Sequence, residues 1–268
     1  MFSKAFMRPI LSVTAVSACA VSLVMTGCGG GSNLYLIKNL KSVAIVQIAS
    51  NKTVEWEDRD EGRGVGAGIQ SQVKMIGALA KGKKLSEAVE EGQHSTEKAI
   101  NSGVDLVYEI FRKEAALPII GKEIVLTNAA YMEMEDDTRF QANLRRAEGY
   151  KVPPLKDNPE LASKLCDALG VDALLTVEVE FAKNLWTGVG SSGAAKANAD
   201  VMLRLYDRNG ECIWWDSESE YSEKSIGMGG GAYDYEKMDT LAVDALGWAM
   251  REALRDLKDD LEKLEVEN

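Results

Sequence analysis

The sequence has little histidine, cysteine or proline, and it carries more acid than base. It holds one histidine, four cysteines and five prolines in 268 residues, with a formal net charge of −11. We therefore expect neither a multi-histidine metal site nor a His-based catalytic triad. His94 stands at the start of a predicted helix, and we predict that it is solvated rather than a general base. The acidic balance argues against nucleic-acid binding.

Other catalytic or cofactor motifs are also missing. The alternating glycines at 62–68 lack the Lys-Ser/Thr pair of a phosphate loop. The acidic stretch 55–61 could bind calcium, but its spacing does not fit an EF-hand and Arg59 interrupts it, so we favour a solvated loop. No carboxylate pair stands out as a glycosidase pair. The sequence therefore predicts a protein that is not an enzyme and has no cofactor and no metal.

The N-terminal residues have the pattern of an export signal. Lys4 and Arg8 are the only charged residues before Cys28, and 9–27 is apolar or small. Its length is close to the ~20 residues of a membrane-spanning helix, so a membrane anchor is the alternative. The residues that favour the signal resemble the lipobox of bacterial lipoproteins, with Met in place of the usual Leu: Val24-Met25-Thr26-Gly27-Cys28. We predict a signal peptide at 1–27 and lipidation of Cys28.

Residues 28–40 are predicted to be the lipidated cysteine and a flexible tether, because Gly29-Gly30-Gly31-Ser32 has little to bury. Several acyl chains on one cysteine make a stable anchor. Glycine rather than aspartate after the cysteine resembles the enterobacterial sorting signal for the outer membrane. We therefore expect a lipid-anchored protein on the periplasmic face of the outer membrane. Removal of the signal takes the net charge from −11 to −13.

The remainder, 41–268, is predicted to be one periplasmic domain with a Gly-rich insertion at 50–84. That insertion is too long for an ordinary connection. Hydrophobic period and capping residues predict the elements. The expected strands are 43–49, 123–127, 171–181, 197–207 and 211–221, and the expected helices are 95–116, 136–148, 157–169 and 234–264. The fold class is α/β: a single mixed sheet of about five strands, parallel at first and then an antiparallel meander, covered by helices and ending in a long C-terminal helix.

The last hairpin allows two registers. A two-residue Asn-Gly turn pairs Leu203 with Asp216, whereas a three-residue turn with Gly210 in a left-handed conformation pairs Leu203 with Trp215. The second register puts apolar residues opposite each other, and it places Arg204 opposite Trp214 on the other face. We predict the second register.

Three segments together resemble a family of periplasmic lipoproteins. They are Lys41–Val46, Leu169–Val179 and Val201–Glu211. Their order is similar to that in the domain shared by the curli-secretion lipoprotein (CsgG-like), the lipoprotein activators of penicillin-binding proteins and the N-terminal domain of TolB. The resemblance implies an adaptor or assembly role in the envelope. It also leaves a secretion-channel subunit as the alternative, although 50–84 lacks the sustained alternation of membrane-facing strands.

The expected partners are the membrane, through the lipid, and another envelope protein or further copies of the chain. Apolar residues set among charges and glycines are the candidate contacts: Trp56, Val65, Trp186 and Met228. The competing interpretation is that 50–84 has no role. Cys166 and Cys212 can form a disulfide in an oxidising compartment or remain buried thiols.

The lipobox gives the first testable prediction. Cys28→Ser should leave an unprocessed precursor that incorporates no labelled palmitate, because the thiol is the acylated group. Metabolic labelling followed by electrophoresis measures both. Normal acylation of the serine variant would contradict the lipoprotein interpretation.

Overall fold

The computed structural model describes residues 33–57, 65–82, 93–114, 117–137, 144–156 and 158–266. Its centre is a seven-stranded mixed sheet with the order β3-β1-β4-β5-β6, to which β2 adds beside β4 and β7 beside β5. The strands are β1 Val43–Asn51, β2 Glu55–Trp56, β3 Leu144–Arg146, β4 Ala173–Val189, β5 Ser192–Asp207, β6 Cys212–Tyr221 and β7 Ile226–Met228. The predicted class, a single mixed α/β sheet with a long C-terminal helix, is confirmed.

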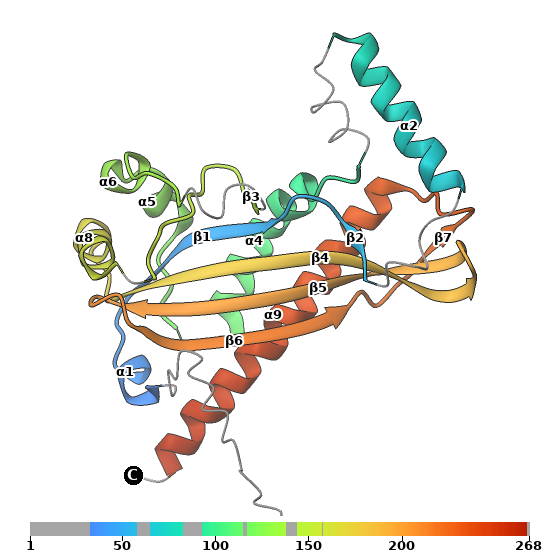
Figure 1. Ribbon diagram of the computed structural model, residues 1–268. Helices are drawn as coiled ribbons and strands as arrows, with labels where there is room; N and C mark the ends of the chain where they lie inside the picture. Colours follow the sequence, from blue (N-terminus) through green and yellow to red (C-terminus); the bar gives the residue numbers. More distant parts are fainter. Residues whose placement is uncertain are drawn as a thin grey trace, which may run out of the picture.

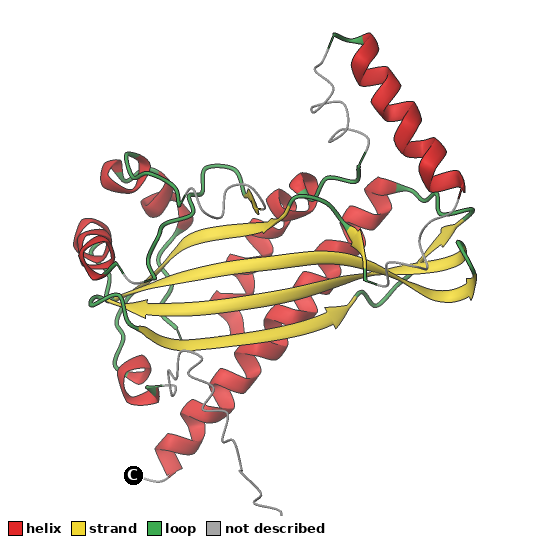
Figure 2. Cartoon of the chain, viewed as in Figure 1, coloured by secondary structure: helices red, strands yellow, loops and turns green. Residues whose placement is uncertain are grey.

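Helices cover the two faces unequally (Figures 1 and 2). α4 and the long α9 pack across one whole face, while α5, α6 and α8 lie on the other face at one end only. α2 stands away from the sheet at the opposite end. The helices are α1 Leu34–Lys38, α2 Val65–Ala80, α4 Glu97–Glu114, α5 Lys122–Leu126, α6 Ala129–Met132, α8 Pro159–Leu169 and α9 Tyr235–Val266. Within the described ranges, no helix is long and apolar enough to cross a membrane.

β1 is the buried strand that the apolar run predicts. It lies parallel to β4 and antiparallel to β3. Val43 and Ile45 face the core under α4 and α9, whereas Ala44 and Val46 face the smaller core under α5, α6 and α8. Two covered faces explain why the strand has no polar alternation.

The predicted helix at 157–169 also forms, over Pro159–Leu169, with a cap at each end. The Asn158 side chain accepts a hydrogen bond from the Leu161 N–H, and Pro159 occupies the first turn. Gly170 ends the helix with φ of 66°, a left-handed conformation that glycine adopts without a Cβ clash.

Two predicted elements are wrong. Residues 123–127 were expected to be a strand, but they lie in helix α5 and the following cap, and Ile119 forms the bridge to Val43 instead. A run this short has no period that separates strand from helix. The expected helix at 136–148 does not form over its described part, since 144–146 is β3. Asp136 accepts a hydrogen bond from the Val152 N–H, so its carboxylate caps a loop rather than a helix.

The predicted hairpin register is also wrong, although the predicted turn is present. Gly210 has φ of 75°, and the Asp207 N–H donates to Glu211 O across the three-residue turn. Beyond Tyr206–Cys212 the register shifts at a bulge, which pairs Leu205 with Trp214 and Leu203 with Asp216. The bulge buries Ile213 and Trp214 together, each 4% exposed, and turns Trp215 outward, 49% exposed.

This register predicts unequal effects of two neighbouring substitutions. Trp214→Ala should lower the free energy of unfolding by ~3–5 kcal/mol, as buried aromatic truncations do. Trp215→Ala should lower it by less than about 1 kcal/mol, because its ring is half exposed. Urea denaturation of both variants measures the difference, and equal losses would contradict the observed register.

Candidate functional site

The two longest strands project past their neighbours. The pairing of β1 with β4 ends at Val179, and that of β6 with β5 ends at Asn198, yet β4 and β5 continue together to Val189 and Ser192. We use the name hairpin tip for residues 186–195, and the name distal end for the hairpin tip together with β7 and α2. Figure 1 shows these segments at one end of the sheet, with α1 and α8 at the other. The expected strands stop at 181 and resume at 197, because small residues and glycines hide the strand pattern between them.

The hairpin tip depends on glycine. Gly188 and Gly193 face each other across the strands with φ of 141° and 154°. A Cβ on Gly193 would lie 1.9 Å from Thr187 O, and one on Gly188 would lie 2.2 Å from Ser192 O. No side chain fits there, so the glycines allow the close strand approach that shapes the tip.

The distal end exposes large apolar side chains. Trp186 is 55% exposed and Val189 is 88% exposed at the hairpin tip. On α2, Val73 and Ile76 are 64% and 61% exposed. Soluble proteins usually keep such side chains apart or cover them, so a group at one end of a sheet indicates a contact surface.

Trp186 is part of a strand rather than a loop. It lies in β4, at the register shift between Leu185 and Thr187. Lys196 on β5 places its Nζ 4.1 Å from the centroid of the Trp186 ring. The centroid of the Tyr221 ring lies 6.2 Å from that of Trp186, and the two ring planes are tilted by 49°. The Tyr221 hydroxyl donates to Glu57, 2.8 Å away. These contacts fix the ring orientation on the sheet face that the helices leave open.

A buried polar cluster supports the base of the distal end. The prediction that His94 is solvated is wrong, because its residue is 6% exposed. His94 Nε2 lies 2.7 Å from Asp239 Oδ1 on α9, and Nδ1 lies 3.1 Å from the Tyr233 hydroxyl. Its ring stacks on Tyr235 at 4.3 Å. The Val54 N–H donates to His94 O, and this backbone hydrogen bond helps to position the histidine beside α9.

Lys183 on β4 also belongs to the cluster and is buried, with 4% of the residue exposed. Its Nζ donates to Val54 O and lies 5.0 Å from the Trp56 ring and 5.3 Å from the Tyr233 ring. Burial lowers the pKa of Lys183 to about 8, although Glu55 opposes the shift. One carbonyl acceptor and two aromatic rings replace only part of the water that would surround the Lys183 ammonium group in solution.

The cluster also holds α2. Lys74 Nζ lies 3.4 Å from the centroid of the Tyr235 ring, and Gln70 Nε2 donates to Tyr233 O at 3.0 Å. The cluster therefore joins α2, β2, β4 and α9 at one point. Because His94 and Lys183 are buried beneath aromatic rings, the arrangement fits a structural support better than an exposed reaction centre.

The other predicted contact residues divide. Trp56 is half-buried against the core and above Lys183. Met228 is only 6% exposed, because β7 pairs with β5 and turns it inward, so it presents little surface to a partner and its contact role stays a prediction. Val65 is the first residue of α2, and its side chain lies outside the described residues, as does Cys28.

Cys166 and Cys212 are not joined by a disulfide in this structure. Both contact the smaller core, where Cys166 is completely buried and Cys212 is half-buried. Burial raises the pKa of the Cys166 thiol to about 11, so the thiolate is disfavoured.

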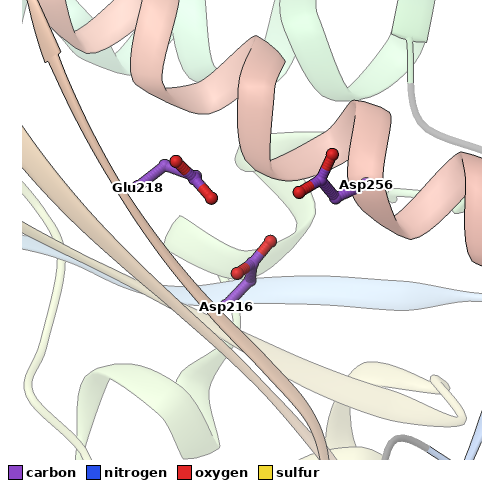
Figure 3. Close-up of side chains that lie close together, drawn as sticks. All are labelled: Asp216, Glu218 and Asp256. Atoms are coloured by element: carbon purple, nitrogen blue, oxygen red, sulfur yellow. The ribbon is translucent and has the colours of Figure 1, made fainter.

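Three carboxylates converge between β6 and α9 (Figure 3). Asp216, Glu218 and Asp256 each place an oxygen within 4.8 Å of the others. Burial raises the pKa values of Asp216 and Glu218, and neighbouring acids raise them further. Oxygen donors of this kind can bind a hard divalent cation. Sequence reasoning missed the group because Asp256 is distant in the chain and the predicted register turned Asp216 away from α9.

Comparison with known proteins adds little. No protein-family model matches the chain, and no curated protein is similar to it. The lipoprotein GNA1162 from Neisseria meningitidis is 15% identical, with a TM-score of 0.28 over 77% of this chain and 96% of its own. The hypothetical protein CT253 from Chlamydia trachomatis is 14% identical, with a TM-score of 0.29 over 61% of this chain and 82% of its own. Neither similarity assigns a function to this chain.

The buried lysine gives a pH prediction. Its pKa of about 8 in the folded state is below the unfolded value, so protonated Lys183 destabilises the fold below pH 8. That destabilisation is relieved as the pH rises towards the unfolded pKa of ~10.4. The advantage of Lys183→Met over the wild type should therefore fall by ~1–3 kcal/mol between about pH 7 and pH 10. Denaturation at both pH values measures it. A stability difference between Lys183→Met and the wild type that does not change with pH would contradict the lowered pKa of Lys183.

Proposed function

We propose that this chain is a lipid-anchored protein of the outer membrane, on its periplasmic face, that binds another envelope protein through the distal end and catalyses no reaction. The observation that carries the proposal is the separation of the exposed apolar side chains from the point where the tether joins the fold. Trp186 and Val189 are at one end of the sheet, whereas α1 is at the other.

The length of the tether can be compared with the length of the sheet. Asn33 donates its backbone N–H to Ile213 O, so the tether joins the fold beside the start of β6. Cys28 precedes Asn33 by five residues, which span at most ~18 Å when extended. β4 has 17 residues, or ~55 Å at the usual rise. With Cys28 acylated, the α1 end would stay near the membrane and the distal end could reach well into the periplasm.

The absence of catalysis is part of the proposal. His94 and Lys183 are both buried under aromatic rings. A substrate would have to displace Tyr235 or Trp56 to reach them. Tyr233 and Tyr235 of this cluster also contact Gln70 and Lys74 of α2, so the cluster supports a binding surface.

We also propose membership of the CsgG-like, penicillin-binding-protein-activator and TolB superfamily. Its support is that the three resembling segments adopt the expected elements. Lys41–Val46 leads into β1, Leu169–Val179 joins α8 to β4, and Val201–Glu211 forms the second meander strand and its turn. An adaptor role follows from that membership.

Substitution of exposed residues tests the binding surface without disturbing the buried cluster. The lipidated protein carrying Trp186→Ala, Val73→Ser and Ile76→Ser should recover at least about ten-fold less of its partner from crosslinked envelope extracts, because aromatic and apolar anchors carry most contact energy. Quantitative mass spectrometry of the captured proteins measures the loss.

The matched control is Trp248→Ala, which removes a tryptophan of similar exposure, 44%, from α9. It should leave capture unchanged. Circular dichroism and membrane fractionation confirm that each variant is folded and anchored. Undiminished capture by the folded, anchored triple variant would rule out the distal end as the binding surface.

A further inference from the structure

The outer edge of β6 is unpaired within the part of the chain that the structure describes. β6 is the last strand in the sheet order and pairs only with β5. Its first residues are covered, since Asn33 donates to Ile213 O and α1 packs beside them. From Trp215 to Tyr221 the edge pairs with no strand of the described chain, and a further strand could add there once the Asp216 carboxylate releases the Ser217 N–H.

Acidic side chains occupy alternate positions along this edge. Asp216 and Glu218 lie opposite Leu203 and Val201, on the face that α9 covers, and Glu220 continues the row. Among the residues described, none of the three acids makes an ion pair; the Asp216 carboxylate accepts only the Ser217 N–H. The row is therefore an uncompensated negative stripe.

The neighbouring helix strengthens this charge. Asp256 brings its carboxylate within 4.8 Å of Asp216 and Glu218 (Figure 3). Glu252 and Asp260 lie on the same helix, but Arg255 contacts Glu252, and Lys263 lies 2.7 Å from Asp260. Arg255 also lies 3.9 Å from Asp256, so among the described residues the carboxylates of this group without an ion partner are those of β6: Asp216, Glu218 and Glu220.

We propose that the edge of β6 from Trp215 to Tyr221 binds an extended segment of a partner protein that carries Lys or Arg at alternate positions. Directly opposed side chains on paired strands have Cβ atoms ~4.5–5.5 Å apart. Each basic residue would then face one acid of the row, while main-chain hydrogen bonds supply affinity. The intervening side chains would lie on the open face, where one can cover the half-exposed Trp215 ring.

Charge decides against a second copy of this chain as the occupant. In a two-fold antiparallel pairing of β6 with itself, residues on the same face have the same parity. In the register that pairs all of 215–221 with its copy, Asp216 would face Glu220 and Glu218 would face Glu218 of the other copy. Like charges directly opposite destabilise a strand pair, so the row favours a basic segment.

A synthetic peptide tests the proposal on the full mature chain. The probe is fluorescent Thr-Lys-Val-Lys-Thr-Lys-Val, and its control replaces every Lys by Glu. Fluorescence anisotropy should show binding of the Lys peptide alone, weakened by salt. Asp216→Asn with Glu218→Gln should weaken it by about three- to ten-fold, because two ion pairs are lost.

Glu180→Gln with Asp200→Asn is the matched control, because it removes the same charge from the open face of the sheet. It should leave the affinity unchanged. Amide hydrogen exchange should show that the Lys peptide protects backbone within 215–221. Absence of binding, equal binding by the two double variants, or binding without that protection would each overturn the proposal. Val73→Ser with Ile76→Ser changes only α2 at the distal end, so this variant should leave peptide binding unchanged.

Discussion

The two-sided pairing of β4 determines where every functional feature lies. One edge of β4 is parallel to β1 and the other is antiparallel to β5, starting from Ala173. β4 has 17 residues and β1 has nine, so the excess length must project past β1. That projection forms the distal end and carries Lys183 to the cluster beneath α2. Through β5, the same pairing also sets the position of the β6 edge.

Much of the fold follows from strong local patterns in the sequence. The buried run of β1 and the apolar stripes of α4 and α9 have clear periods, and Asn158 and Gly170 supply caps that local chemistry identifies. These elements bury large apolar areas, so tertiary packing reinforces the local preference. The short run at 123–127 has too few residues for a period, and Asp136 satisfies a loop backbone group that the sequence does not reveal.

The features of the candidate sites depend on contacts between distant segments. Ile213, Trp214 and Trp215 are three large apolar residues in a row, so alternation cannot tell which of them face the core. The bulge buries the first two and exposes the third, and this shift brings Asp216 to face α9. His94 becomes buried for a similar reason, since Asp239 lies 145 residues further along the chain. Trp186, by contrast, was identifiable as an apolar residue among small and polar ones.

The two proposed surfaces would respond differently to ionic strength. Contacts by Trp186 and Val73 would gain free energy mainly from desolvation of apolar area, which salt does not screen. The acidic row of β6 would act through charges near the surface, whose interaction weakens as the Debye length falls from ~10 Å at 0.1 M salt to ~3 Å at 1 M. A single partner that occupied both would lose only its β6 contact at high salt. Salt-dependent capture therefore separates the contribution of the sheet edge from that of the distal end.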